Sequence, residues 1–254
     1  MESALGLPGE VYAAGLVFVR VAAVVMLLPG IGETAVPPRV RLGFALLLTF
    51  VLTPIVSGGL PGVPPTVGAL GGQVIGEALV GLMLGALLRL FLTSLAVAGE
   101  VISLQTTLSF AQISNPTQAQ PTAALASFLT LLGLLLIFAT DLHHLFIAAI
   151  ARSYVLFAPG KALPLGDVAT LAGETLAQSF SLGLQLAAPV VVFSLVLNVA
   201  MGLIGRVMPQ FQVFFAAAPI SVLGGLSIFA LSLGVLGLVW LDRYEAFARR
   251  FAGG

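Results

Sequence analysis

Four long stretches of this 254-residue chain carry no charged residue. They are residues 42–76, 101–140, 175–205 and 207–241. About 20 apolar residues in a helix cross the hydrocarbon core of a bilayer, so each stretch is long enough for a crossing. Apolar residues make up 59 % of the chain and charged residues 8 %, which is too little charge to cover a soluble protein of this length. The sequence therefore predicts an all-α integral membrane protein.

Clusters of proline and glycine divide the apolar sequence into six expected helices. We treat the whole chain, 1–254, as a single membrane domain. One of these helices would be about 58 Å long at about 1.5 Å per residue, which exceeds a bilayer core of about 30 Å. We therefore expect bent or projecting helices rather than six simple crossings. The expected helices are 11–29, 40–56, 67–105, 123–157, 169–205 and 211–241.

A few ionisable residues interrupt the apolar segments. Charges at membrane depth are costly and are suspected of function by default. We expect these residues to pair with one another or with partner subunits rather than to relay protons. Glu77 and Arg89 are twelve residues apart and cannot meet along one helix, so their partners must lie elsewhere. The five candidates are Arg20, Glu77, Arg89, Glu100 and Arg206.

Glycines recur along the expected helix 67–105 in two groups, 68–76 and 81–85, and within each group the spacing is four residues. Small residues at this spacing let helix backbones approach closely within a membrane. Two interpretations remain open, namely contact within the chain and contact with other subunits. The glycines are Gly68, Gly72, Gly76, Gly81 and Gly85.

The residues offer little for catalysis, metal binding or nucleic-acid binding. Cysteine is absent, and the net charge is zero, so there is no thiolate ligand and no basic field for nucleic acid. His143 and His144 are the only histidines, and adjacent helical residues point about 100° apart, which disfavours joint chelation. We expect them to lie at an interface or to cap a helix. We expect no enzyme, no cofactor and no metal site.

The segment 106–122, TTLSFAQISNPTQAQPT, carries no charge but is rich in amides and hydroxyls. Pro116 and Pro121 keep it out of a helix, because the residue before each proline is pushed towards an extended conformation. Irregular backbone at membrane depth occurs only where it is buried in protein or lines a cavity. From these residues alone, an ordinary solvent loop between two helices is the simpler interpretation.

Four stretches, read in order, resemble the FliR family of the bacterial flagellar export gate, which has counterparts in type III secretion injectisomes. The first is RVAAVVMLLPGIGETAVPPRVRLGFALLLTFVLTP at 20–54, and the second is AGEVISLQTTLSFAQISNPT at 98–117. DLHHLF at 141–146 follows, and the last is GLQLAAPVVVFSLVLNVAMGLIGRVMPQFQVFFAAAP at 183–219. The last stretch contains the family's glycine–arginine–proline–glutamine turn, here formed by Arg206, Pro209 and Gln210.

The resemblance implies a fold of long kinked helical hairpins that pack into a hetero-oligomeric, helical export gate. It implies FliP and FliQ as partners, with FlhB associated, and unfolded flagellar proteins as passing substrates. The assembly would lie among the lipids of the bacterial inner membrane, at the flagellar basal body. In this family the loop matching 106–122 reaches into the pore and helps to plug it. The plug residues would be Phe110, Gln112, Ile113, Ser114, Asn115, Pro116 and Pro121.

Two departures from the family pattern and several rival functions remain. The family usually has an acidic residue where Asn115 stands, which leaves any charge-dependent role of the plug open. It often has Gly-Phe before the proline that matches Pro219, where this chain has AAAP. The rival functions are a secondary transporter for a small solute, an injectisome export-gate subunit, and a structural subunit outside the pore. Transporters also use broken helices and polar segments at midplane.

Overall fold

The computed structural model describes residues 9–107, 124–161, 165–208 and 213–253, and every regular element within them is helical. Five helices are long and apolar enough to span a membrane, and a broken pair, α5 with α6, makes a sixth if it is counted as one span. The prediction of an all-α integral membrane protein is therefore confirmed. The elements are α1 (Gly9–Leu27), α2 (Pro38–Val56), the short 3₁₀ helix η1 (Ser57–Gly59), α3 (Val67–Gln105), α5 (Ala124–Ala139), α6 (His143–Leu156), α7 (Leu165–Val207) and α8 (Val213–Ala252).

The expected helix 123–157 is wrong, because a turn at residues 140–142 divides it into α5 and α6. Asp141 adopts a left-handed backbone conformation with φ of 59°, which a helix cannot contain. Aspartate tolerates this conformation because its short polar side chain bonds locally. No glycine or proline marks the break, so residues 139–143 carry no strong turn signal.

The last helix extends eleven residues beyond its expected end at 241, to Ala252 in α8. The extension contains all the charges of the C-terminal segment, yet it keeps one buried apolar stripe. Trp240, Tyr244, Phe247 and Phe251 are buried at spacings of four, three and four residues. This spacing is that of one helix face, so burial of the stripe continues the helix where hydropathy alone predicts an end.

The chain forms two compact units. The first consists of Met1–Phe91, Thr140–Leu176 and Glu245–Gly254, and the second of Leu92–Ala139 and Ala177–Tyr244. The helices α3, α7 and α8 each continue from one unit into the other. The single membrane domain over 1–254 stays a prediction.

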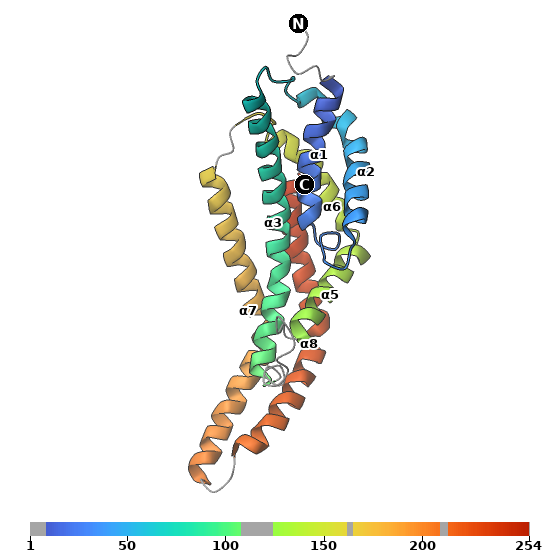
Figure 1. The fold of residues 1–254 in the computed structure, drawn as a ribbon. Helices are drawn as coiled ribbons and strands as arrows, with labels where there is room; N and C mark the ends of the chain where they lie inside the picture. The colour runs from blue at the N-terminus through green and yellow to red at the C-terminus, as the bar shows by residue number, and fades with distance from the viewer. Residues whose placement is uncertain (1–8, 108–123, 162–164, 209–212, 254) are drawn as a thin grey trace. The chain divides into compact units, whose positions relative to one another are not determined.

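The core of the first unit forms where α1 meets α2 and α3. Figure 1 shows α1 and α2 side by side. Val17, Val21 and Val24 have no exposed surface, because they lie on one face of α1 at helical spacing. Phe91 of α3 stacks on Phe247 of α8, with ring centroids 4.6 Å apart.

The core of the second unit is centred on Trp240 of α8, whose side chain is fully buried. Its indole Nε1 donates a hydrogen bond to Ser94 Oγ of α3 over 3.1 Å, and its ring stacks on Tyr244 with centroids 4.9 Å apart. Gly133 of α5 leaves room for Leu95 and for the indole, since a Cβ there would collide with a methyl carbon of Leu95 and lie 3.3 Å from a ring carbon of Trp240. Because the buried indole N–H needs a hydrogen-bond acceptor, this bond fixes the ring in one orientation within the apolar core.

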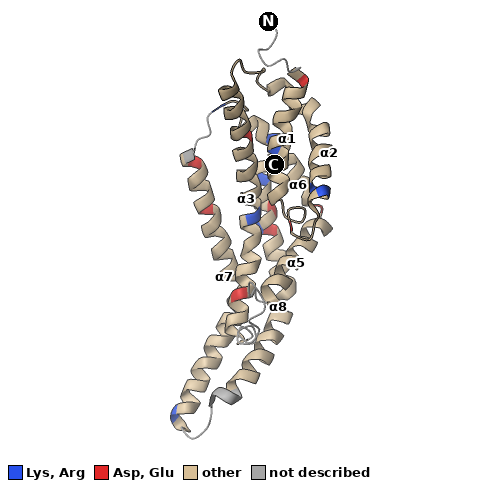
Figure 2. Cartoon of the chain, viewed as in Figure 1, with Lys and Arg blue, Asp and Glu red and all other residues tan. Residues whose placement is uncertain are grey.

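Much of the apolar surface of the spanning helices is not covered by the chain itself. Only 17 % of the most apolar window of α2, α7 or α8 is buried. Figure 2 shows long stretches of α7 and α8 without charge. Lipid or other chains must therefore cover these faces, because apolar surface of this extent is not stable in water.

Candidate functional site

A buried ion pair joins α1 to α3 in the first unit. Arg20 Nε donates to Glu77 Oε2 over 2.6 Å, and Nη2 donates to Oε1 over 3.0 Å. Arg20 has no exposed surface, and Glu77 is 2 % exposed. The two parallel bonds match the planar guanidinium to the planar carboxylate, which is the strongest geometry for such a pair.

The Arg20 guanidinium also contacts residues in and just after α6. Nη1 donates to Ser153 Oγ over 3.1 Å, and Nη2 donates to the carbonyl oxygen of Phe157 over 2.8 Å. The guanidinium carbon also lies 4.0 Å from the centre of the Tyr154 ring. Arg20 therefore links three helices, and removal of its side chain would leave Glu77 as an uncompensated buried charge.

Arg89 pairs with Glu33, in the segment between α1 and α2, far more loosely. Its Nη2 lies 3.5 Å from Glu33 Oε2, and the two side chains are 40 % and 28 % exposed. Pairs of this length and exposure contribute about 0–1 kcal/mol. The Arg20–Glu77 pair is therefore shorter and far more buried than the Arg89–Glu33 pair.

The structure separates the glycines of α3 into two groups. A Cβ at Gly81 would collide with the carbonyl oxygen of Arg20, and one at Gly85 would lie 2.8 Å from Leu27 Cβ. These two glycines let α3 cross α1 closely, which is packing within the chain. No atom of the described residues lies within 4 Å of a Cβ built at Gly68, Gly72 or Gly76. A role of these three in contact with other subunits stays a prediction.

In the second unit, the end of α3 is held by α7 and α8. Ser194 Oγ of α7 donates to the side-chain oxygen of Gln105 over 2.8 Å, and Ser221 Oγ of α8 lies 3.2 Å from the Gln105 carbonyl oxygen. Thr106 Oγ1 donates to the carbonyl oxygen of Ile102 over 2.8 Å. Thr107 then turns the chain out of the helix with a left-handed φ of 59°. These contacts fix where the uncharged segment 106–122 begins.

The predicted plug residues and part of the arginine turn lie outside the described residues. They are Phe110, Gln112, Ile113, Ser114, Asn115, Pro116, Pro121, Pro209 and Gln210. Arg206 is described and lies exposed in the last turn of α7. Glu100 is half-buried on α3, in the second unit. Glu100 and Arg206 belong to the second unit, whereas Arg20 and Glu77 belong to the first.

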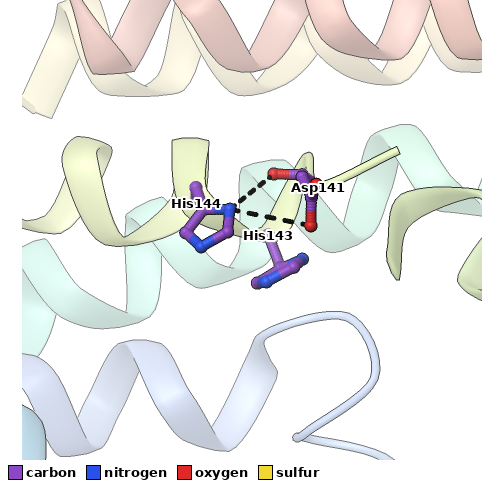
Figure 3. A group of neighbouring side chains, drawn as sticks. All are labelled: Asp141, His143 and His144. Carbon is purple, nitrogen blue, oxygen red and sulfur yellow. Dashed lines mark hydrogen bonds and ion pairs between the residues drawn. The ribbon is translucent and has the colours of Figure 1, made fainter. Parts of the chain in front are cut away.

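Asp141, His143 and His144 lie together at the break between α5 and α6, as Figure 3 shows. One potential ligand atom from each lies within 4.8 Å of the others, and the two imidazole centroids are 4.2 Å apart. Adjacent positions in the helix therefore do not keep these side chains apart, although His143 and His144 are the first two residues of α6. His144 Nδ1 lies 3.2 Å from the Asp141 carbonyl oxygen, which is a contact of the first helical turn. The side chains of Asp141 and His144 are 76 % and 67 % exposed. Ligands that are not held in place by surrounding residues bind a metal weakly.

The model of the family described as bacterial export proteins, family 1, matches residues 11–247. The chain belongs to this family. It is 59 % identical to the flagellar biosynthetic protein FliR of Caulobacter vibrioides over 236 residues, 93 % of this chain and 94 % of the relative. It is 33 % identical to FliR of Escherichia coli over 83 % of this chain and 80 % of the relative, and 27 % identical to FliR of Bacillus subtilis over 82 % and 80 %.

Membership of this export family, together with the spanning helices, makes the chain a multi-pass membrane subunit of the flagellar type III export apparatus. The resemblance to the FliR family is thereby confirmed, and the transporter interpretation is not favoured.

Sequence reasoning missed the polar residues that hold this family member's helices together. Ser153, Ser194 and Ser221 are single hydroxyls within apolar helices, and each contacts a polar group on another helix. Gln105 has no predicted role beyond its place at the end of the expected helix 67–105. A polar side chain within an uncharged helical segment is the signal that could have found them, because such groups require a partner in lipid.

Proposed function

We propose that the chain forms part of the pore of the flagellar export gate and that residues 106–122 help to close it. The observation that carries this proposal is the end of α3. There Gln105 is fixed by hydroxyls of α7 and α8, so the uncharged segment begins from a rigid point. A plug has to be anchored at its base if it is to reclose after a substrate has passed.

The chemistry of the segment supports a seal that accepts chains of any sequence. Fixed charges would retain some unfolded substrates and repel others. Amides and hydroxyls can instead bond to one another when the pore is closed and to a passing backbone when it is open. Phe110 and Ile113 would wedge against neighbouring subunits, and Pro116 and Pro121 would keep the segment irregular.

The proposed partners are FliP and FliQ within the gate and FlhB beside it, in the bacterial inner membrane. The apolar faces of α2, α7 and α8 that the chain itself leaves uncovered are evidence for contact with partner chains. So do Gly68, Gly72 and Gly76, which face open space within this chain. We propose no catalytic role, because the family consists of export components and the most buried ionisable pair, Arg20 with Glu77, serves a structural contact.

Affinity purification of the tagged chain from its own cells in mild detergent tests the assembly. Mass spectrometry should identify three different small membrane proteins in constant proportion to the tagged chain. A tagged FliR-family chain that purifies as a stable monomer or homo-oligomer, while the cells still assemble flagella, would contradict the proposal. The matched control is the same purification from cells that carry the tag on an unrelated multi-pass protein.

A further inference from the structure

The first half of α7 carries a polar stripe that the chain itself leaves exposed. Its five residues follow one another at spacings of three or four residues, and at about 100° per residue they fall within about 80° around the helix axis. The stripe therefore lies on one side of a single continuous helix. Its residues are Asp167, Thr170, Glu174, Gln178 and Ser181, and all five are exposed.

Two carboxylates in this stripe have no cationic partner among the described residues. Asp167 and Glu174 are the acidic residues of α7, whose second half carries none, as Figure 2 shows. Neither side chain forms an ion pair or a hydrogen bond with any residue that the structure describes. Lipid does not suit this side of the helix, because charged side chains are costly in hydrocarbon and pair with other groups there.

An apolar stripe runs along α7 beside the polar one, over overlapping turns. Leu176, Phe180 and Leu184 are 55 %, 55 % and 43 % exposed. Water does not suit this side, because large apolar side chains grouped on a surface are stable only when they are covered. The buried face of α7, which includes Ser179 and Leu182, lies on a third side, so neither exposed stripe packs against the chain itself.

Small residues lie between the two stripes. Gly173 and Ala177 are exposed there, one turn apart, and a Cβ built at Gly173 would have no described atom within 4 Å. Small residues at this spacing let two helix backbones approach closely, and polar side chains beside them bond across the interface. A helix seated over Gly173 and Ala177 would contact the polar stripe on one side and the apolar stripe on the other. Lipid or water alone suits only one of the two stripes.

We propose that a helix of another export-apparatus subunit packs along this side of α7, over Gly173 and Ala177. Charge complementarity places a lysine or arginine of that helix opposite Glu174, while its apolar side chains cover Leu176 and Phe180. The channel lumen fits less well, because fixed carboxylates would retain basic stretches of an unfolded substrate. This interface rests on the proposed assembly with partner chains and is independent of the plug.

Photoreactive amino acids at Gln178 and Phe180 test the interface in growing cells, because these positions lie on opposite sides of the small residues. Both should crosslink to one and the same membrane subunit of the export apparatus, identified by mass spectrometry of the product. Crosslinks from Gln178 to an exported flagellar protein would assign the polar stripe to the channel lumen, and crosslinks from Phe180 to lipid would assign the apolar stripe to the bilayer. Either result overturns the proposal, as does the failure of the two positions to capture the same chain.

Reversal of the charge at Glu174 tests the expected cation. Glu174→Lys should lower co-purification of the crosslinked subunit about tenfold at equal amounts of the full-length chain, because like charges across an interface repel. Asp242→Lys is the matched control and should leave the yield unchanged, since Asp242 is also an exposed acidic residue, on α8. Replacement of a lysine or arginine by glutamate in the captured segment of the partner should restore co-purification with Glu174→Lys. Unchanged co-purification in Glu174→Lys would overturn the proposal, and so would the failure of every such replacement to restore it.

Co-purification with the wild-type chain separates this interface from the wider proposal. A chain that retains its partner subunits, while Gln178 and Phe180 capture none of them, would contradict only the interface on α7. A chain that purifies alone would contradict the proposed assembly itself.

Discussion

Arg20 and Glu77 lie 57 residues apart in the sequence and meet through two hydrogen bonds of 2.6 and 3.0 Å, with Arg20 fully buried and Glu77 only 2 % exposed. The pair joins the first helix to the third, and Ser153 brings α6 into the same network. A charge pair so deeply buried holds the helices in one arrangement, since any other arrangement exposes an ion to an apolar surrounding.

Removal of one member of this pair should be more harmful than removal of both. Arg20→Met and Glu77→Leu should each cost about 3–5 kcal/mol, because each leaves an unpaired buried charge, and the double variant should cost less than either. Thermal unfolding of the detergent-solubilised complex measures these differences. If the costs of the two single changes simply add in the double variant, the pair is not coupled as the structure indicates.

Gly81 should tolerate no side chain. A Cβ there would overlap the Arg20 carbonyl oxygen and lie 2.7 Å from Ala23 Cβ, so α1 and α3 would have to separate. Gly81→Ala should destabilise the chain by about 1–3 kcal/mol. Gly43→Ala on α2 is the matched control, because no described atom lies near its Cβ position. Similar unfolding temperatures for the two variants would rule out close packing at Gly81.

Arg206 should matter more for assembly than Arg249. Arg206 lies in the last turn of α7, where its guanidinium can bond to the free carbonyl groups of the helix end or to a partner's carboxylate. Arg249 pairs with Glu245 on an exposed face of α8, and such a pair contributes about 0.3–0.5 kcal/mol. Arg206→Ala should reduce co-purification of the partner chains, and Arg249→Ala should not. Equal, mild losses would contradict a structural role for Arg206.

The anchor at Gln105 should control how tightly the gate closes. Gln105→Leu removes the bond from Ser194, which contributes about 0.5–1.5 kcal/mol, so the base of the following segment becomes less fixed. Ion conductance of the resting complex in a planar bilayer should rise above wild type, while Gln185→Leu should leave it unchanged. Wild-type conductance in both variants would show that the anchor does not govern closure.

The sequence predicted most of the helical spans but not which helices and residues contact each other within the chain. The bounds of 67–105 agree with those of α3, because turn residues precede it and the amide-rich segment follows it. The break at Asp141 was missed because a left-handed aspartate leaves no mark in hydropathy. The pairing of Arg20 with Glu77 could not be predicted, since only the fold decides which helices meet. Likewise, identical glycine spacing gave no sign that Gly81 packs within the chain while Gly72 faces open space.

The plug is tested most directly by the ion conductance of purified export complexes in planar bilayers. Wild type is compared with a deletion of residues 110–116 and with a variant that carries a glycine–serine segment of the same length, after equal assembly has been confirmed. The deleted complex should assemble, since the packing surfaces lie on the helices, and it should conduct ions in the resting state where the wild type does not. A deleted complex that assembles fully and conducts no more than wild type would contradict the proposed plug.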